Sequence, residues 1–260
     1  KIATNHGLMS DMPKISQDDY ITSYEKNNKT NQISVVDGFK ISSNYVFRRL
    51  VKDNYGEEPE EFIHRLHQYN FGEAYDFDLK ESGISGSTIP DPKDAGWTIY
   101  DLVSVAIGYS VKATPLQIVT FYNAIANNGK MMKPYIVESI EHEGRVTREF
   151  KPQILNGSIC SKATADTLTR ALKMVTLEGT ASRLKNAKCT VAGKTGTART
   201  VLSPDENPQK KDPYVSEDGK RKYQATFVGF FPADDPKYSV IVTRYTDLSH
   251  RKENGSGKPA

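Results

Sequence analysis

The sequence predicts an α+β domain in which an antiparallel sheet is flanked by helices on both sides. Two observations support this: several helices carry clear capping signals, and three β-rich segments lie toward the carboxyl end of the chain. The links between those segments are short or looped, which suits antiparallel pairing, because parallel strands need long crossovers. With 260 residues the chain can bury a sizeable core, and we interpret residues 1–260 as one domain.

The predicted helices begin at residues that commonly cap helices. Ser34, Thr114 and Ser161 each offer a hydroxyl to the first turn, Pro115 fits the first helical position, and Gly129 fits just past an end. Helices are expected over residues 34–39, from residue 46, over residues 59–69, around residue 101, from residue 114 to just before Gly129, and over residues 161–178.

The predicted strands are rich in β-branched and aromatic residues, which favour a pleated, half-buried surface. Three of them are expected over residues 190–201, 224–231 and 238–245. Two shorter strands are expected over residues 136–140 and 145–150, on either side of a Glu143–Gly144 turn.

Composition excludes several classes of function. The net charge of +3 is too small to indicate a nucleic-acid binder, and no run of 18 apolar residues is present. The five histidines form no H-E-x-x-H motif, and the two cysteines have no C-x-x-C spacing, so we expect no metal and no cofactor. We interpret Cys160 and Cys189 as two buried thiols, although a disulfide is chemically possible.

The most informative segment reads A-G-K-T-G-T-A over residues 192–198, inside a predicted strand. Lys194, Thr195 and Thr197 are expected to place three anion-binding groups on one face of that strand. Gly196 lacks a Cβ, so a ligand could approach the backbone closely. The segment therefore predicts the wall of a site for a carboxylate and a carbonyl. A phosphate loop is excluded, because only Gly193 precedes the lysine and the flanks are β-branched.

A second segment reads S-S-N at residues 42–44, between two predicted helices. At such a junction the hydroxyl of Ser42 and the amide of Asn44 can point out of the packed scaffold into a cleft. The alternative is that these residues only form a turn or a cap, where Ser and Asn are common.

The segments between these two motifs resemble the class B penicillin-binding proteins. The sequence pattern G-x-x-V-x-x-T-P-L-Q, followed by A-x-A-N-x-G, covers residues 108–129. The segment E-G-T-A at residues 178–181 precedes the K-T-G strand. Trp97 and the pair Lys133–Pro134 also match in family order. The resemblance runs over about residues 33–245 and is closest to the cell-division transpeptidase of Bacteroidetes-type bacteria. It implies the β-lactamase/transpeptidase-like fold, in which S-x-N and K-T-G are two of three signature motifs.

The resemblance implies a peptidoglycan D,D-transpeptidase that acts through a serine acyl-enzyme on D-Ala-D-Ala stem peptides and is inhibited by β-lactams. Ser42 would relay a proton to the leaving nitrogen, and Asn44 would hydrogen-bond the lysine of the nucleophile motif and the substrate amide. Lys194 would supply positive charge that favours the terminal carboxylate.

The remaining roles implied by the resemblance fall on the K-T-G strand. The hydroxyls of Thr195 and Thr197 would bind the substrate carboxylate, and the backbone N–H of Thr197 would form half of the oxyanion hole. Gly196 would keep the strand bare, so that the substrate can lie along it as an added strand.

The family's third motif, S-x-x-K, is expected upstream of S-x-N. The chain has S-x-x-K strings at residues 23–26, 182–185 and 249–252, which we interpret as chance matches. We therefore expect a fragment that is incomplete at both ends and inactive alone. The resemblance implies that its parent has an N-terminal membrane anchor and acts on the periplasmic face of the bacterial inner membrane, with divisome or elongasome membrane proteins as partners.

Two other functions remain open at this stage. One is a serine β-lactamase or D,D-carboxypeptidase, which uses the same motifs in a more compact chain. The other is a non-catalytic penicillin sensor or a scaffold for division proteins, although the intact S-x-N and K-T-G triplets argue against a decayed site.

Overall fold

The computed structural model describes residues 15–16, 32–74, 87–205, 213–216 and 219–246. Its elements are, in chain order, β1 (Ile15–Ser16), β2 (Gln32–Ile33), α1 (Val35–Lys40), α2 (Asn44–Tyr55), α3 (Pro59–Gln68), α4 (Ile99–Val105), α5 (Pro115–Ala126), β3 (Met131–Met132), β4 (Ser139–His142), β5 (Arg145–Glu149), β6 (Ile154–Asn156), α6 (Lys162–Leu177), the 3₁₀ helix η2 (Ser182–Leu184), β7 (Ala192–Thr200), β8 (Lys222–Phe231) and β9 (Tyr238–Tyr245).

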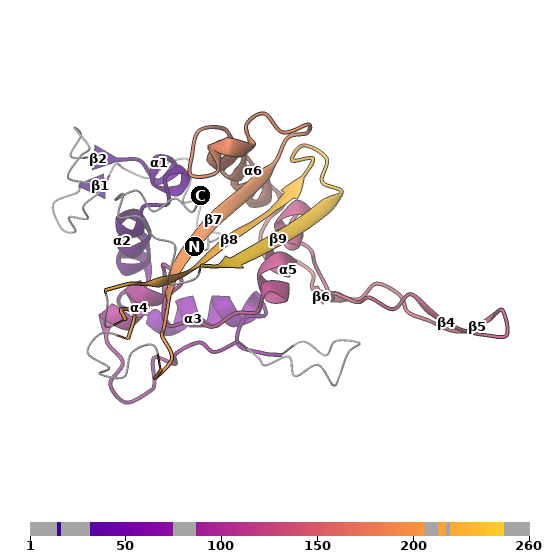
Figure 1. Cartoon of the computed structure of the whole chain (residues 1–260), viewed down its shortest axis with the longest axis horizontal. Helices are drawn as coiled ribbons and strands as arrows, with labels where there is room; N and C mark the ends of the chain where they lie inside the picture. Colours follow the sequence, from indigo (N-terminus) through magenta and orange to yellow (C-terminus); the bar gives the residue numbers. More distant parts are fainter. Residues whose placement is uncertain (1–14, 17–31, 75–86, 206–212, 217–218, 247–260) are drawn as a thin grey trace.

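The main sheet has three antiparallel strands in the order β7–β8–β9 (Figure 1). The register sets Lys194 opposite Val228 and Gly196 opposite Thr226. The three predicted strands and their antiparallel pairing are thereby confirmed. The connection from β8 to β9 is short, over residues 232–237, whereas residues 201–221 separate β7 from β8. Within the described sheet β7 is an edge strand, paired on one side with β8.

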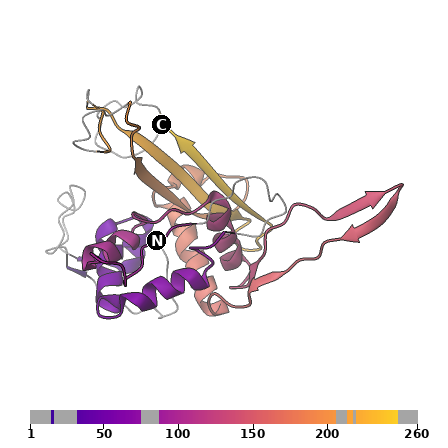
Figure 2. The ribbon, with the colours of Figure 1, turned by 90° about the horizontal axis from the view of Figure 1, so that it is seen from below.

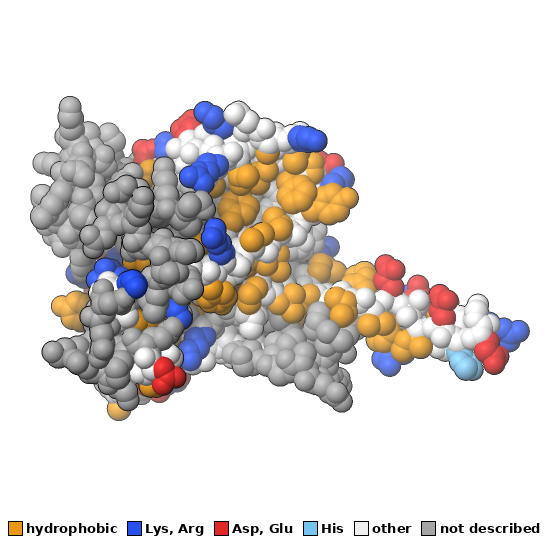
Figure 3. Space-filling view, viewed as in Figure 1, with side chains coloured by type: hydrophobic (Ala, Val, Ile, Leu, Met, Phe, Trp, Pro, Cys, Tyr) orange, Lys and Arg blue, Asp and Glu red, His pale blue; other side chains and the backbone are white. Residues whose placement is uncertain are grey.

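Helices cover one face of this sheet. The helix α6 packs on β7, and α5 packs on β8 and β9; Figures 1 and 2 show both helices on the same side of the strands. The buried side chains of Ala192 and Phe230 join the sheet to the helical core. We expected helices on both sides of the sheet. Within the described residues the other face is exposed, because the side chains of Tyr238 and Val242 on it are open to solvent. Hydrophobic side chains gather on this face (Figure 3).

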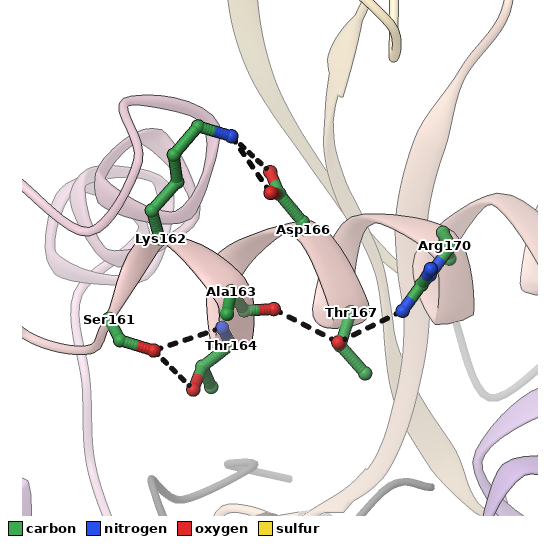
Figure 4. Close-up of polar contacts among 7 residues, drawn as sticks. All are labelled: Ser161, Lys162, Ala163, Thr164, Asp166, Thr167 and Arg170. Carbon is green, nitrogen blue, oxygen red and sulfur yellow. Dashed lines mark hydrogen bonds and ion pairs between the residues drawn. The ribbon is translucent and has the colours of Figure 1, made fainter.

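The capping signals explain where the helices begin. The Ser161 hydroxyl accepts a hydrogen bond from the Thr164 amide at 3.1 Å and caps α6, while Lys162 forms an ion pair with Asp166 one turn on (Figure 4). Thr114 forms a capping box with Gln117 at the start of α5. The predicted caps are therefore confirmed.

The strands β4 and β5 form a hairpin that projects away from the body of the molecule (Figures 1 and 2). Glu143 and Gly144 have φ of 50° and 74°, which gives a tight turn whose twist matches that of paired strands. His142 and Arg145 are consequently the first pair. The first strand of the hairpin covers Ser139–His142 rather than the predicted residues 136–140, because the two-residue turn extends pairing up to its own edge.

The interpretation of both cysteines as buried is wrong for one of them. Cys160 is buried beside Gly129, whereas Cys189 is exposed on the approach to β7, and both are free thiols. Among the helices that the structure describes, none is long and apolar enough to cross a membrane.

A polar cluster fixes the start of β7 against α6 and the β8–β9 connection. Asp234 accepts hydrogen bonds from the Lys173 ammonium at 2.6 Å and from the Thr190 hydroxyl at 2.9 Å. The same Thr190 hydroxyl accepts from the Ala233 amide at 3.0 Å. Hydrogen bonds from Lys173 and Thr190 lower the pKa of Asp234 below its usual value.

We predict that Asp234→Asn destabilises the chain at neutral pH, because it removes the charge that these donors meet. A carboxylate whose pKa is lowered by folding contributes stability above its unfolded pKa, and this contribution is lost as the pH falls through the folded pKa. The difference in urea midpoint between the two proteins should therefore disappear in acid. Asp235→Asn, which alters an exposed pair with Lys237, is the matched control. A difference that persists at low pH would contradict the assignment.

Candidate functional site

The S-x-N triplet lies in the turn between α1 and α2, as predicted. Ser42 has φ of 64°, a left-handed conformation that is uncommon for a residue with a side chain. The backbone N–H groups of Ser42 and Ser43 donate to the carbonyls of Phe39 and Gly38 at 3.1 and 2.8 Å. These bonds hold the turn against the end of α1.

The capping role falls on the middle residue of the triplet. The Ser43 hydroxyl accepts a hydrogen bond from the Val46 amide at 3.4 Å, so Ser43 is the N-cap of α2. Asn44 is the first residue of α2 and is exposed, and Ser42 is partly buried. The alternative that the triplet forms a cap thus applies to Ser43. The outer residues of the motif, Ser42 and Asn44, lie directly before and after this N-cap.

The helices around this turn pack closely. The buried Val46 side chain lies against the Cα of Gly38, where an added Cβ would collide with it. Val35, Tyr45 and Leu50 complete a small apolar cluster between α1 and α2. The turn is therefore held by packing as well as by hydrogen bonds.

The K-T-G triplet lies in the middle of β7, but its side chains do not share one face as we expected. Successive residues of a strand point to opposite faces. Lys194 therefore lies on the face of buried Ala192, toward the helices, while Thr195 and Thr197 lie on the other face. Thr195 is partly buried and Thr197 is exposed.

Lys194 is a buried cation. Only 5% of its surface is exposed, and its ammonium donates a hydrogen bond to the Thr195 carbonyl at 3.1 Å. Burial disfavours the charged form and lowers the pKa of Lys194 to about 8. An anion close to this ammonium would favour its charged form.

Gly196 leaves the centre of β7 open. A Cβ built on it would have nothing within 4 Å, whereas one on Gly193 would collide with the Phe227 ring. The two glycines of the motif region therefore serve different purposes. Gly193 allows tight packing within the sheet, and Gly196 allows another molecule to approach the strand.

The E-G-T-A turn, residues 178–181, joins the two motifs. The Thr180 amide donates to the Lys40 carbonyl at 3.3 Å, two residues before Ser42. The Thr180 hydroxyl lies 2.6 Å from that of Thr195 in the K-T-G strand. Segments far apart in the sequence thus meet at the end of α6.

Two further contacts hold this turn against α1. Lys40 forms ion pairs with Glu178 and Asp37, both at 3.2 Å, and the hydrogen bond to Glu178 is the main cause that raises the pKa of Lys40. Gly179 packs directly on the Lys40 carbonyl oxygen, which an added Cβ would strike. The described contacts therefore connect the S-x-N and K-T-G segments through the E-G-T-A turn.

Sequence reasoning missed the part played by Lys40 and Thr180. In the sequence analysis, the E-G-T-A string served only as one of the matches to the family. The local signal was available, since a glycine directly after a capped helix often marks its carboxyl end. Nothing local indicated what the following threonine would contact, because its partner is on another element.

The described S-x-x-K string, residues 182–185, does not lie at the start of a buried helix. Ser182 begins the 3₁₀ helix η2, none of whose residues is buried, and Lys185 is exposed. The strings at residues 23–26 and 249–252 lie outside the described residues.

The arrangement of a buried lysine on an open edge strand, joined to an S-x-N turn, agrees with the family comparison. The model of the penicillin-binding protein transpeptidase domain matches residues 1–259. The chain belongs to this family. The class B assignment is confirmed by relatives that include penicillin-binding protein H and the D,D-transpeptidase MrdA.

Curated relatives of this transpeptidase domain are longer than the chain. Penicillin-binding protein H of Bacillus subtilis is 32% identical over 69% of this chain and 25% of its own length. PbpB of Mycolicibacterium smegmatis is 30% identical over 76% of the chain and 29% of its own length. The chain thus spans between a quarter and a third of these two proteins.

Solved structures confirm the β-lactamase/transpeptidase fold. Penicillin-binding protein 3 of Mycobacterium tuberculosis, complexed with aztreonam, matches with a TM-score of 0.69 and 24% identity over 86% of this chain and 48% of its own. Penicillin-binding protein 2B of Streptococcus pneumoniae matches with a TM-score of 0.68 and 20% identity over 88% of this chain and 38% of its own.

We predict that Lys194→Met stabilises the chain near neutral pH, by up to roughly 3 kcal/mol, because it removes a charge that is costly to bury. Between about pH 8 and pH 10.5 the folded wild type releases the Lys194 proton while the unfolded chain keeps it, so wild-type stability rises with pH. The advantage of the variant should shrink over that window.

Urea denaturation of both proteins at about pH 7 and about pH 9.5 measures this difference. Lys185→Met, at an exposed position, is the control and should show no pH-dependent difference. A Lys194→Met variant that is less stable by the same amount at both pH values would disprove the burial argument.

Proposed function

We propose that this domain belongs to a peptidoglycan D,D-transpeptidase, which cross-links D-Ala-D-Ala stem peptides through a serine acyl-enzyme and is a target of β-lactams. One observation carries the proposal. A buried lysine with a lowered pKa lies on an exposed edge strand that the E-G-T-A turn connects to the S-x-N turn. Such a constellation suits recognition of a carboxylate next to a reacting carbonyl.

The comparisons support the same reaction. One relative is named peptidoglycan D,D-transpeptidase MrdA, from Haemophilus influenzae, 32% identical over 56% of this chain and 23% of its own length. A structural neighbour, penicillin-binding protein A of Mycobacterium tuberculosis, is described as a penicillin G acyl-enzyme complex. Because the chain spans only part of such proteins, the activity of the whole protein is our proposal.

In this proposal β7 is the binding edge. A stem peptide would lie antiparallel to it past Gly196, as an added strand. The hydroxyls of Thr195 and Thr197 would receive its terminal carboxylate. The N–H of Thr197 would stabilise the developing oxyanion, a role for which one donor elsewhere contributes about 3 to 4 kcal/mol.

Proton transfer is assigned to the S-x-N turn. Ser42 would pass a proton to the leaving D-alanine nitrogen, and Asn44 would hydrogen-bond the lysine of the nucleophile motif and the substrate amide. Lys194, on the opposite face of β7 from the two threonine side chains, would favour the carboxylate through its positive charge rather than by direct contact, and it would favour proton transfer on the Ser42 side. The attacking serine would come from an S-x-x-K helix of the natural protein outside these residues.

The substrate also suggests a location. Stem peptides are cross-linked outside the cytoplasmic membrane, so we propose the periplasmic face of the inner membrane and an N-terminal anchor in the natural protein. Its partners would be membrane proteins of the divisome, in keeping with the cell-division type that the sequence resembles, or of the elongasome.

We predict that the 260-residue chain alone forms no covalent adduct with a fluorescent penicillin, because we interpret its three S-x-x-K strings as chance matches and the described one, at residues 182–185, begins no buried helix. Denaturing gel electrophoresis after incubation measures the adduct. A labelled band would contradict the prediction, and mapping the labelled residue would locate a nucleophile within these residues.

In the natural protein that contains this chain, we predict that Lys194→Ala slows acylation by a carboxylate-bearing penicillin roughly tenfold to hundredfold, because the positive charge that favours the carboxylate and the proton transfer is lost. The melting temperature should not fall. Lys162→Ala, which removes an exposed ion pair on α6, is the control and should acylate normally.

Stopped-flow acylation rates measure this effect. An unchanged acylation rate in Lys194→Ala would show that Lys194 takes no part in the site. Rapid turnover of penicillin by the wild-type protein would favour a β-lactamase or carboxypeptidase instead, and a natural protein that no penicillin acylates would favour a non-catalytic sensor or scaffold.

A further inference from the structure

We propose that Thr180 is a positioning residue for carboxylate recognition, and that its hydroxyl sets the direction in which the Thr195 hydroxyl donates. The inference rests on the proposed function, because it concerns the ligand of the K-T-G strand. It assigns a role to a residue outside the three signature motifs.

The geometry begins with the distance between the two hydroxyl oxygens, which is 2.6 Å. Thr195 belongs to β7, whereas Thr180 belongs to the E-G-T-A turn at the end of α6. The contact is therefore made from outside the sheet. Thr180 is exposed and Thr195 is partly buried, so the pair lies at the surface that a ligand would reach.

The backbone of Thr180 is held on both sides. Its own amide donates to the Lys40 carbonyl at 3.3 Å, and the Ala181 amide donates to the Val175 carbonyl at 3.1 Å. Gly179, directly before it, packs on the Lys40 carbonyl oxygen. The backbone that carries the Thr180 hydroxyl is thus held in place and is connected through Lys40 to the segment that carries Ser42.

Proton counting gives the direction of the hydrogen bond once an anion binds. Each hydroxyl has one proton to donate and can accept through its oxygen. An ionised carboxylate can only accept, so Thr195 must donate its proton to the ligand. The bond between the hydroxyls then runs from Thr180 to Thr195, and each bond of this chain polarises the next.

A purely structural role would look different. The Thr226 and Thr243 hydroxyls also meet, at 3.2 Å, but they belong to neighbouring strands that backbone hydrogen bonds already pair. Loss of that contact should leave ligand recognition unchanged. If Thr180 acts on the ligand carboxylate through Thr195, removal of the Thr180 hydroxyl should slow acylation only by ligands that carry a carboxylate.

The experiment measures acylation of the natural protein by benzylpenicillin and by its uncharged methyl ester. We expect Thr180→Val to slow acylation by benzylpenicillin about fivefold to tenfold, in line with one hydrogen bond, and to leave the ester rate unchanged. Thr180→Ser should retain the wild-type ratio of the two rates. Thr243→Val is the matched control and should behave as wild type, and melting temperatures exclude a folding defect.

A second set of variants tests whether Thr180 acts through Thr195. In a Thr195→Val background, Thr180→Val should have no further effect on benzylpenicillin acylation. The inference would be overturned if Thr180→Val slowed acylation by benzylpenicillin and by the ester equally. It would also be overturned if Thr180→Val slowed benzylpenicillin acylation as much in the Thr195→Val background as in the wild type. If Thr180→Val fails to fold, Thr180→Ala and Thr180→Ser are compared by the same rate ratio.

The proposed function fails in a different way. If the wild-type protein is acylated by neither ligand, the transpeptidase proposal is wrong, and the inference falls with it. If the wild type is acylated and Thr180→Val keeps the wild-type rate with benzylpenicillin, only the inference is wrong.

Discussion

The contact between the end of α6 and the end of α1 is the constraint on which the site depends. Gly179 rests on the Lys40 carbonyl oxygen, and the Thr180 amide donates to the same atom. Neither S-x-N nor K-T-G could be placed by its own helix or strand alone. Because α6 also packs on β7, a displacement at this contact would move the turn and the strand relative to each other.

Burial of Lys194 opposes stability and serves recognition. An ammonium surrounded by protein loses most of its hydration, and a carbonyl hydrogen bond replaces only part of it. Proteins keep such groups where a ligand restores the lost interaction. The compact sheet and helix packing around Ala192 and Phe230 supply the stability that this charge removes.

Local patterns predicted the elements well, because their determinants are local. Ser34, Thr114 and Ser161 cap the helices as expected, and the three strands of the sheet lie where β-branched residues gather. The face assignment of Lys194 was wrong because the pleat, which separates neighbouring residues, was not applied to the adjacent pair Lys194 and Thr195.

The remaining features depend on contacts between distant segments. Cys189 is exposed because the chain leaves α6 along the surface before it enters the sheet, and no spacing of two cysteines reveals that path. The contact between Thr180 and Thr195 depends in the same way on how α6 docks. Capping and periodicity describe each element but not its orientation toward the next.

The hairpin of β4 and β5 has a consequence for how this domain tolerates change in length. Its strands pack chiefly on each other, beyond the body of the molecule (Figure 2). Removing the opposed pair His142 and Arg145 next to the turn leaves the other pairs opposite each other, and it lies away from the described contacts around Ser42 and Lys194. Matched insertions and deletions at its tip are therefore nearly neutral for chemistry, which makes this arm the natural attachment point for a tag or probe.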